Sequence, residues 1–244
     1  MPRVFGAAGR IGLVVPANNS VIEPEFWSVL PPGVSVHASR LLAKGDLTAE
    51  AIERMERDAG AAVEQIAATG VDVIAYCDMV TTFIMQARWN ESNMARFSQA
   101  SGVACLSAWT ALRDALAATG ARRIALGTPY PRAIHARVPP FFEAQGFEVR
   151  REATLDIVAM HEVPAVGPER LEAFVRSLDP SGCDALVLLA TDLPTFASIA
   201  ALEAAYGVML LTSNQTLLWR ALRELPAAGP VAGLGRLFAT RDRA

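Results

Sequence analysis

The sequence predicts an α/β fold of two similar halves, each a Rossmann-like parallel sheet covered by helices, with a cleft between them. Short β-branched runs alternate with longer Ala-, Leu- and Glu-rich stretches over all 244 residues, a pattern typical of parallel sheets covered on both faces. The pattern also repeats. Ile11–Pro16 resembles Ile124–Pro129, 113 positions later, and Val73–Asp78 resembles Val187–Asp192, 114 positions later.

Seven segments combine β-branched residues with flanking turn residues and predict buried strands: Ile11–Pro16, Val34–Ala38, Val71–Cys77, Ile124–Thr128, Phe147–Arg151, Ala185–Ala190 and Val208–Thr212. Seven longer segments have apolar residues at helical spacing and predict helices: Thr48–Thr69, Asn90–Ser101, Ala108–Thr119, Ile134–Gln145, Pro168–Leu178, Thr195–Tyr206 and Thr216–Leu225. Gly70, Gly120 and Gly207 directly follow three of these helices, where glycine is a common helix stop.

No Gly/Ser/Pro linker separates the halves. We expect the boundary near Ser107–Trp109. We expect the first half to comprise residues 1–107 plus 213–244, and the second half residues 108–212. In this division the tail segment Gly233–Phe238 packs back on the first half.

Composition limits the class of protein. Hydrophobic residues make up 52% and charged residues 19% of the chain, which suits a folded domain with a full core. The net charge is −3 and no dense basic patch occurs, so we expect no nucleic-acid partner. No apolar run reaches membrane-spanning length. Residues 1–10 lack the apolar core of a signal peptide, so we expect a cytoplasmic protein without membrane contact.

Metal and nucleotide sites are poorly supported. The three cysteines (Cys77, Cys105 and Cys183) form no CxxC pair, and the three histidines share no metal-ligand spacing. The spaced glycines of Gly6–Gly12 precede a strand, whereas a dinucleotide site needs them after one. We therefore expect no metal and no organic cofactor.

Ligands of open parallel sheets bind beyond the carboxyl ends of the strands. Cys77 stands at such an end, just before an expected helix. The N–H groups at a helix N-terminus favour thiolate over thiol, and they also bind carboxylates. That pairing suits proton abstraction next to a carboxylate, or thiolate addition to an activated double bond. The alternative is a buried cysteine that only closes a strand.

Three motifs in order carry a family resemblance: Pro16–Phe26 with its Asn19, Thr128–Tyr130, and Ser213–Gln215 followed by Leu218-Trp219. Together they resemble the maleate isomerase and arylmalonate decarboxylase branch of the aspartate/glutamate racemase superfamily, over nearly the whole chain. The resemblance implies two pseudo-symmetric halves, no cofactor, and usually a dimer.

The resemblance also implies one catalytic position in each half, which are Cys77 and Thr191 here, with Asn19 and Tyr130 holding substrate carboxylate. Racemases and isomerases of the superfamily usually have cysteine at both positions, and the decarboxylases only at the second. A threonine hydroxyl is far less acidic than a thiol, although it can donate a hydrogen bond.

The residues that follow the two catalytic positions are Asp78 and Asp192. Relatives often have small or hydroxyl residues there, which donate hydrogen bonds to carboxylate. Two ionised aspartates would repel a dicarboxylate. Three explanations stay open: the side chains turn away, one is protonated, or the substrate is not a simple dicarboxylate. Either aspartate could also serve simply as a helix N-cap.

These observations predict a cofactor-independent isomerase or racemase of a small carboxylate or amide, with Cys77 as nucleophile or base and Thr191 as donor on the opposite face. One alternative is an arylmalonate-type decarboxylase, and another is a non-catalytic ligand-binding protein. We expect substrate contacts from nine residues: Pro16, Asn19, Asp78, Met79, Tyr130, Asp192, Leu193, Ser213 and Asn214.

Overall fold

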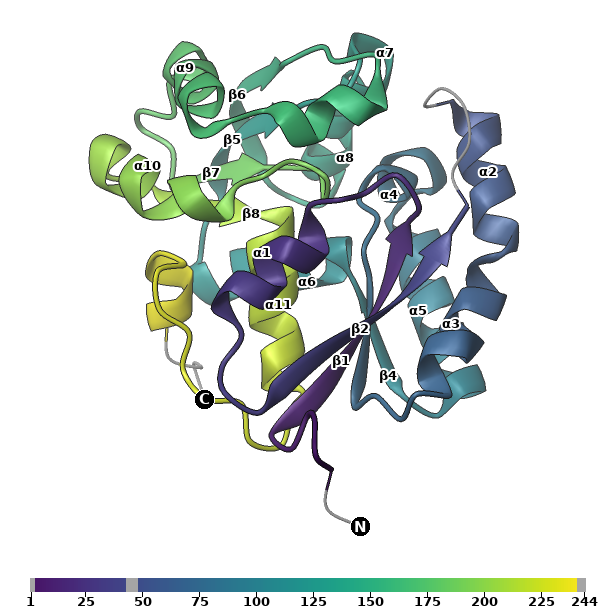
Figure 1. Cartoon of the computed structure of the whole chain (residues 1–244). Helices are drawn as coiled ribbons and strands as arrows, with labels where there is room; N and C mark the ends of the chain where they lie inside the picture. Colours follow the sequence, from purple (N-terminus) through teal and green to yellow (C-terminus); the bar gives the residue numbers. More distant parts are fainter. Residues whose placement is uncertain (1–2, 43–47, 241–244) are drawn as a thin grey trace.

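The computed structural model describes residues 3–42 and 48–240 and contains two four-stranded parallel sheets (Figure 1). The first sheet has the order β2-β1-β3-β4 and the second has the order β6-β5-β7-β8, so both halves share one topology. The strands are β1 Gly9–Pro16, β2 Val34–Leu41, β3 Val73–Tyr76, β4 Ala104–Ser107, β5 Arg123–Thr128, β6 Glu148–Thr154, β7 Ala185–Leu188 and β8 Met209–Thr212. The prediction of two similar α/β halves is confirmed.

Helices connect the strands and cover the sheets. The α-helices are α1 Ile22–Val29, α2 Ala49–Arg57, α3 Ala59–Ala67, α4 Val80–Met85, α5 Ala87–Ser101, α6 Ala108–Thr119, α7 Arg132–His135, α8 Val138–Ala144, α9 Pro168–Leu178, α10 Ile199–Tyr206 and α11 Ser213–Arg223. Three short 3₁₀ helices are η1 Met160–Ala165, η2 Phe196–Ser198 and η3 Arg236–Ala239.

No bounds were predicted for β4, α1 or α4, although a helix was expected after Cys77, and two pairs of helices were merged into one each. The expected helix Thr48–Thr69 is divided at Asp58 into α2 and α3. The expected helix Ile134–Gln145 is divided into α7 and α8, because Pro139 and Pro140 occupy the start of α8, where proline is tolerated, rather than a helix interior.

The two halves are joined by a pair of helices. α6, which follows the first sheet, packs against α11, which follows the second. α11 also contacts β3 and β4 of the first sheet, and α6 contacts β8 of the second (Figure 1). The assignment of residues 213–244 to the first half stays a prediction, and the tail contacts both α11 and the second sheet. Gln215 Nε2 donates to the carbonyl of Leu234 at 2.8 Å, and η3 packs on β8 and α11.

The strand register corrects one detail of the repeat. Ile11 pairs with Val73 in the first sheet, and its counterpart Ile124 pairs with Ala185 in the second. The strands are therefore related by 112 or 113 positions, whereas Cys77 and Thr191 are 114 apart. Consequently Cys77 directly follows its strand, while Thr191 comes after two further residues of the turn beyond β7.

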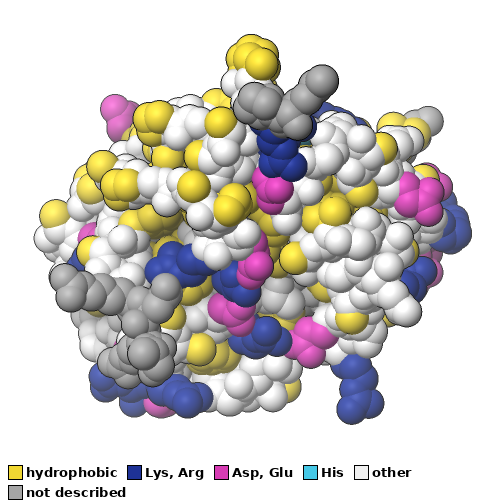
Figure 2. Space-filling model, turned by 90° about the horizontal axis from the view of Figure 1, so that it is seen from below, with side chains coloured by type: hydrophobic (Ala, Val, Ile, Leu, Met, Phe, Trp, Pro, Cys, Tyr) yellow, Lys and Arg dark blue, Asp and Glu magenta, His cyan; other side chains and the backbone are white. Residues whose placement is uncertain are grey.

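Charged side chains are mixed on the face shown in Figure 2, where basic and acidic groups lie next to one another. Ion pairs among the described residues include Arg3–Asp72, Arg113–Glu91 and Arg123–Asp184. Within the described part of the chain, no helix is both long and apolar enough to cross a membrane.

Candidate active site at the junction of the two halves

The two predicted catalytic positions meet across the junction of the halves. The Thr191 hydroxyl donates to the carbonyl oxygen of Cys77 at 2.8 Å. Asn19 Nδ2 donates to the same hydroxyl at 3.1 Å, and Asn19 Oδ1 accepts from the backbone N–H of Val21 at 2.9 Å. All three side chains are buried. The structure therefore brings Asn19, Cys77 and Thr191 together, as the sequence predicted.

The Cys77 thiol is fully buried and donates to the carbonyl of Ala75 at 3.2 Å. Burial raises the pKa of this thiol well above its ordinary value, and the nearby carboxylate of Glu23 adds to the effect. Glu23 forms an ion pair with Arg40, whose guanidinium also donates to the carbonyl of Asn19 at 2.7 Å. Without a ligand, Cys77 is therefore a neutral thiol.

The backbone N–H donor at the start of the following helix binds Asp78 and not the Cys77 thiol. Asp78 Oδ1 accepts from the backbone N–H of Thr81 at 3.1 Å, at the start of α4. Asp78 is thus the N-terminal cap that the sequence left as an alternative. Because the carboxylate occupies this donor, the sequence-based expectation of a thiolate favoured by free helix N–H groups does not hold for the ligand-free protein.

This burial gives a testable pH dependence for Cys77. Because the thiol pKa is raised, little thiolate is present at neutral pH. The thiolate fraction of Cys77 keeps increasing at pH values where an ordinary thiol, with a pKa of about 8.5, is already ionised. We therefore expect iodoacetamide to alkylate Cys77 slowly at pH 7, with a rate that keeps rising above about pH 9. Half-buried Cys105 should react before Cys77 at neutral pH. Peptide mapping after timed alkylation measures both rates, and a plateau for Cys77 below pH 8 would refute this account of its environment.

Three buried titratable side chains lie close enough together at the junction for their charges to interact: Asp78, Tyr130 and Asp192. Burial, together with the charge of Asp78, raises the pKa of Asp192 to about 7. Burial also raises the pKa of Tyr130, and the charges of Asp192 and Asp78 raise it further. Next to the two aspartates lie the buried apolar side chains of Met79 and Leu193.

Ser213 and Asn214, at the start of α11, hold the turn that carries Thr191. Ser213 Oγ accepts from the backbone N–H of Ala190 at 3.1 Å, and Asn214 Nδ2 donates to the carbonyl of Thr191 at 3.0 Å. Ala190 has a φ of 102°, a strained value for a residue with a side chain. These contacts position the turn, and direct contact of Ser213 and Asn214 with substrate stays a prediction, as it does for half-buried Pro16.

The sequence missed two glutamates near the site. Glu25 of α1 reaches across the junction, where it accepts from Asn214 Nδ2 at 2.7 Å and from the backbone N–H of Phe196 at 2.8 Å. Glu56 of α2 accepts a hydrogen bond from the Tyr76 hydroxyl and lies close enough to Asp78 to be affected by its charge. Burial raises the pKa of Glu56 to about 7. Neither contact has a local sequence signal, because each joins segments far apart in the chain.

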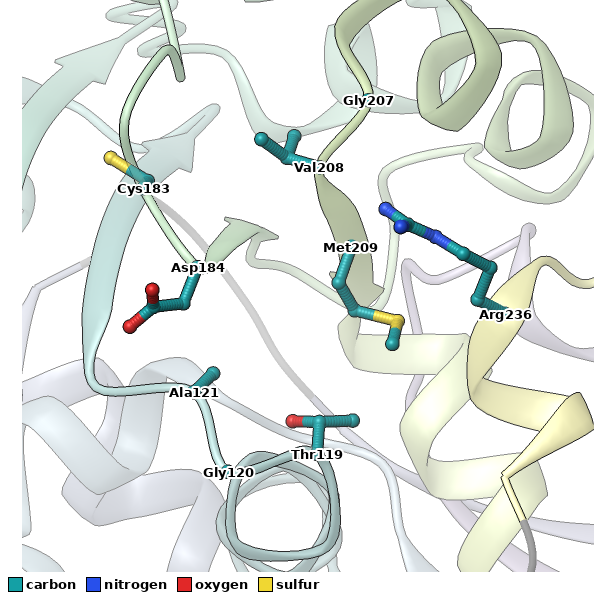
Figure 3. Close-up of a pocket in the computed structure, with 9 residues that line it drawn as sticks. All are labelled: Thr119, Gly120, Ala121, Cys183, Asp184, Gly207, Val208, Met209 and Arg236. Atoms are coloured by element: carbon teal, nitrogen blue, oxygen red, sulfur yellow. The ribbon is translucent and has the colours of Figure 1, made fainter.

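A hollow of about 300 Å³ lies away from the junction, at the amino-terminal ends of β7 and β8 (Figure 3). The side chains of Asp184 and Arg236 lie on opposite sides of it. Asp184 is held by the guanidinium of Arg123, and Arg236 lies 3.7 Å from Glu203. Because its charged groups are already paired, this hollow is a weaker candidate than the junction. Among the described residues, no group of three or more His, Cys, Asp or Glu side chains could hold a metal ion.

Comparison with known proteins agrees with this geometry. The family model described as arylmalonate decarboxylase matches residues 11–238. A maleate isomerase of Nocardia farcinica is 31% identical over 94% of this chain and 95% of its own. An arylmalonate decarboxylase of Bordetella bronchiseptica is 26% identical over 93% of this chain and 95% of its own.

A solved structure is also similar. It is a Cys-to-Ser mutant of Nocardia farcinica maleate cis-trans isomerase with a covalently bound succinylcysteine intermediate. It has a TM-score of 0.86 and 29% identity, covering 94% of this chain and 98% of that chain. These relatives confirm the predicted branch and the prediction of an isomerase-type enzyme that uses cysteine chemistry, with a decarboxylase as a near relative. The chain therefore belongs to the arylmalonate decarboxylase family and is related to the maleate isomerases.

Proposed function

We propose that this enzyme acts on a small carboxylate or its amide at or next to the α-carbon, with Cys77 as the nucleophile or base. The observation that carries the proposal is the meeting of Cys77, Asn19 and Thr191 in one hydrogen-bonded seam between the halves. A buried thiol beside the Asn19 amide donor suits a reaction in which negative charge develops next to a carboxylate.

The substrate carboxylate would be held by Asn19 and Tyr130. Asn19 Nδ2 can turn from the Thr191 hydroxyl to a ligand, and the phenol of Tyr130 stays protonated because its pKa is raised. Cys77 must lose its proton before it can attack or abstract. The carboxyl groups near Cys77 are those of Asp78 and Asp192. The proposed reaction needs no cofactor.

The two aspartates argue against a simple dicarboxylate. Carboxylates facing the site accept hydrogen bonds, so an amide or amine on the substrate suits them better than a second negative charge. The second candidate function is decarboxylation of a substituted malonate, which the family match to arylmalonate decarboxylase favours. The cysteine, however, lies in the half where decarboxylases lack it.

The wider setting is also a proposal. We propose a homodimer, which the family resemblance implies, and light scattering coupled to gel filtration would test it. We also propose a cytoplasmic location. The three cysteines are free, which fits a reducing compartment.

The experiment is a panel assay by proton NMR in D₂O with maleate, maleamate (its monoamide), aspartate and phenylmalonate. We expect Cys77-dependent isomerisation or α-deuteration of at least one compound, with maleamate or aspartate ahead of maleate. Loss of CO₂ from phenylmalonate without any isomerisation would favour the decarboxylase. Binding of these compounds without turnover of any would contradict the proposed enzyme.

A further inference from the structure

Two carboxyl groups face the junction, and the structure holds them differently. Each lies in a segment Asp-x-x-Thr: one spans Asp78–Thr81 after β3, and the other spans Asp192–Thr195 after β7. Asp78 accepts from the backbone N–H of Thr81 at 3.1 Å, and the N–H of Val80 also stabilises its charged form. Burial raises the pKa of Asp78 above its ordinary value, and these capping donors oppose that rise by stabilising the charged form.

Asp192 lacks both of the equivalent backbone donors. The residue two positions after it is Pro194, which has no N–H. The residue three positions after it is Thr195, whose N–H donates to Glu25 Oε1. The same oxygen of Glu25 accepts from Phe196 at 2.8 Å. Among the described residues, only its own backbone N–H stabilises the charge of the Asp192 side chain. Glu25 thus caps this turn and leaves Asp192 uncapped.

The Thr191 hydroxyl, by contrast, is fully used. It donates its hydrogen to the Cys77 carbonyl at 2.8 Å and accepts from Asn19 Nδ2 at 3.1 Å. A hydroxyl has one hydrogen to donate, so Thr191 has none left for a substrate while the seam is intact. It is a structural link between the halves, whereas Asp192 is the free acid beside it.

The surroundings of Asp192 suit proton exchange. It is 7% exposed, and burial with the charge of Asp78 raises its pKa to about 7. Tyr130 is the other titratable group that faces it. On the Cys77 side, the charged groups are Glu23, Asp78 and Arg40. A group with a pKa near the working pH can both give and take a proton.

We propose that Asp192, rather than Thr191, is the acid–base group opposite Cys77, and that Glu25 is the positioning residue that keeps it free. This rests on the proposed function of Cys77. In racemisation, the Cys77 thiolate takes the α-hydrogen as a proton, the C–H electron pair enters the substrate enolate, and the protonated Asp192 returns a proton to the opposite face. In cis–trans isomerisation, the Cys77 thiolate sulfur bonds to one carbon of the double bond, the π pair moves to the other carbon, and that carbon takes the proton of Asp192. After rotation about the new single bond, the Asp192 carboxylate takes a proton back from that carbon, the double bond re-forms, and sulfur leaves as thiolate.

Titration of the aspartates tests the assignment without a substrate. Carbon-13 NMR of protein labelled at the aspartate carboxyl carbons should show one carboxyl group that titrates near pH 7 and disappears in Asp192→Asn. Glu25→Ala frees the N–H of Thr195 for Asp192 and should move this titration to lower pH. Glu25→Gln keeps an acceptor oxygen and should leave it near pH 7. An Asp192 that titrates at about pH 4, the ordinary value, would overturn the proposal.

Pro194→Ala gives a second route if Glu25→Ala does not fold. It restores an N–H two positions after Asp192, as Val80 provides for Asp78, and should also lower the Asp192 titration. An unchanged titration in folded Pro194→Ala would contradict the capping argument.

The catalytic arm uses maleamate turnover. Asp192→Asn should lower kcat by about a hundredfold or more, remove the inflection near pH 7 from the pH–rate profile, and change KM by only a few-fold. Turnover that survives Cys77→Ser would refute the proposed function. Turnover that depends on Cys77, but keeps its rate and pH profile in Asp192→Asn, would refute this inference alone. If aspartate is turned over and maleamate is not, the same comparison is made with aspartate. A wild-type protein inert toward every compound of the panel would count against the proposed function, and the titration would then decide the role of Asp192.

Discussion

Replacing Cys77 by serine should lower turnover of the best panel compound by at least about a thousandfold, while the substrate still binds with a similar Kd. A serine hydroxyl is nearly isosteric with the thiol but far less acidic, so it fills the buried position without supplying an anionic base or nucleophile. Initial rates by NMR measure turnover, and isothermal titration calorimetry measures binding.

The other two cysteines provide matched controls. Cys105 lies in β4 and Cys183 lies just before β7. Among the described residues, neither forms a hydrogen bond with Asn19, Cys77 or Thr191. Cys105→Ser and Cys183→Ser should keep turnover within a few-fold of wild type. Equal activity of Cys77→Ser and these controls would favour the non-catalytic binding protein, or an enzyme with its chemistry elsewhere.

Wild-type protein should isomerise maleate slowly, at less than about 1 per second. The hydroxyl of Thr191 is bound within the seam, and the carboxyl groups of Asp78 and Asp192 oppose a second negative charge on the substrate. Thr191→Cys supplies a second thiol and should raise the rate by about tenfold or more. Adding Asp192→Thr to that variant should raise it further, because the new thiol no longer needs Asp192 as the acid.

The order of these effects is the informative part. Asp192→Thr alone should not raise maleate turnover, since it removes the acid without a replacement. The assay follows loss of maleate absorbance and appearance of fumarate. Fast wild-type turnover of maleate would mean that the two aspartates do not oppose a dicarboxylate in the bound state.

Much of the fold was predictable because it depends on local patterns. Buried parallel strands produce apolar runs such as Ala185–Ala190, and α6 and α9 begin and end where the sequence predicted. β4 was missed because Ala104–Ser107 contains no β-branched residue and begins with an exposed alanine, whereas the equally short β3 and β7 lie in fully buried apolar runs. The two extra residues before Thr191 escaped notice because sequence similarity alone cannot detect a strained Ala190 inside a turn.

The sequence predicted which residues form the site better than it predicted what each of them does. Strand ends and motifs identified Asn19, Cys77 and Thr191, which the structure brings together. Their chemistry depends on partners that are distant in sequence. Glu25 takes the N–H of Thr195, 170 residues away, and thereby changes the role of Asp192. Such contacts follow from the packing of the two halves and have no signature in either segment.

The most direct test of the central claim is a crystal structure of Cys77→Ser with the compound that wild type turns over best. We predict that the compound lies at the junction, with its carboxylate on Asn19 or Tyr130. Its reacting carbon should lie between position 77 and the carboxyl group of Asp192. A ligand in the hollow at Asp184, or one at the junction whose reacting carbon faces away from position 77, would contradict this account.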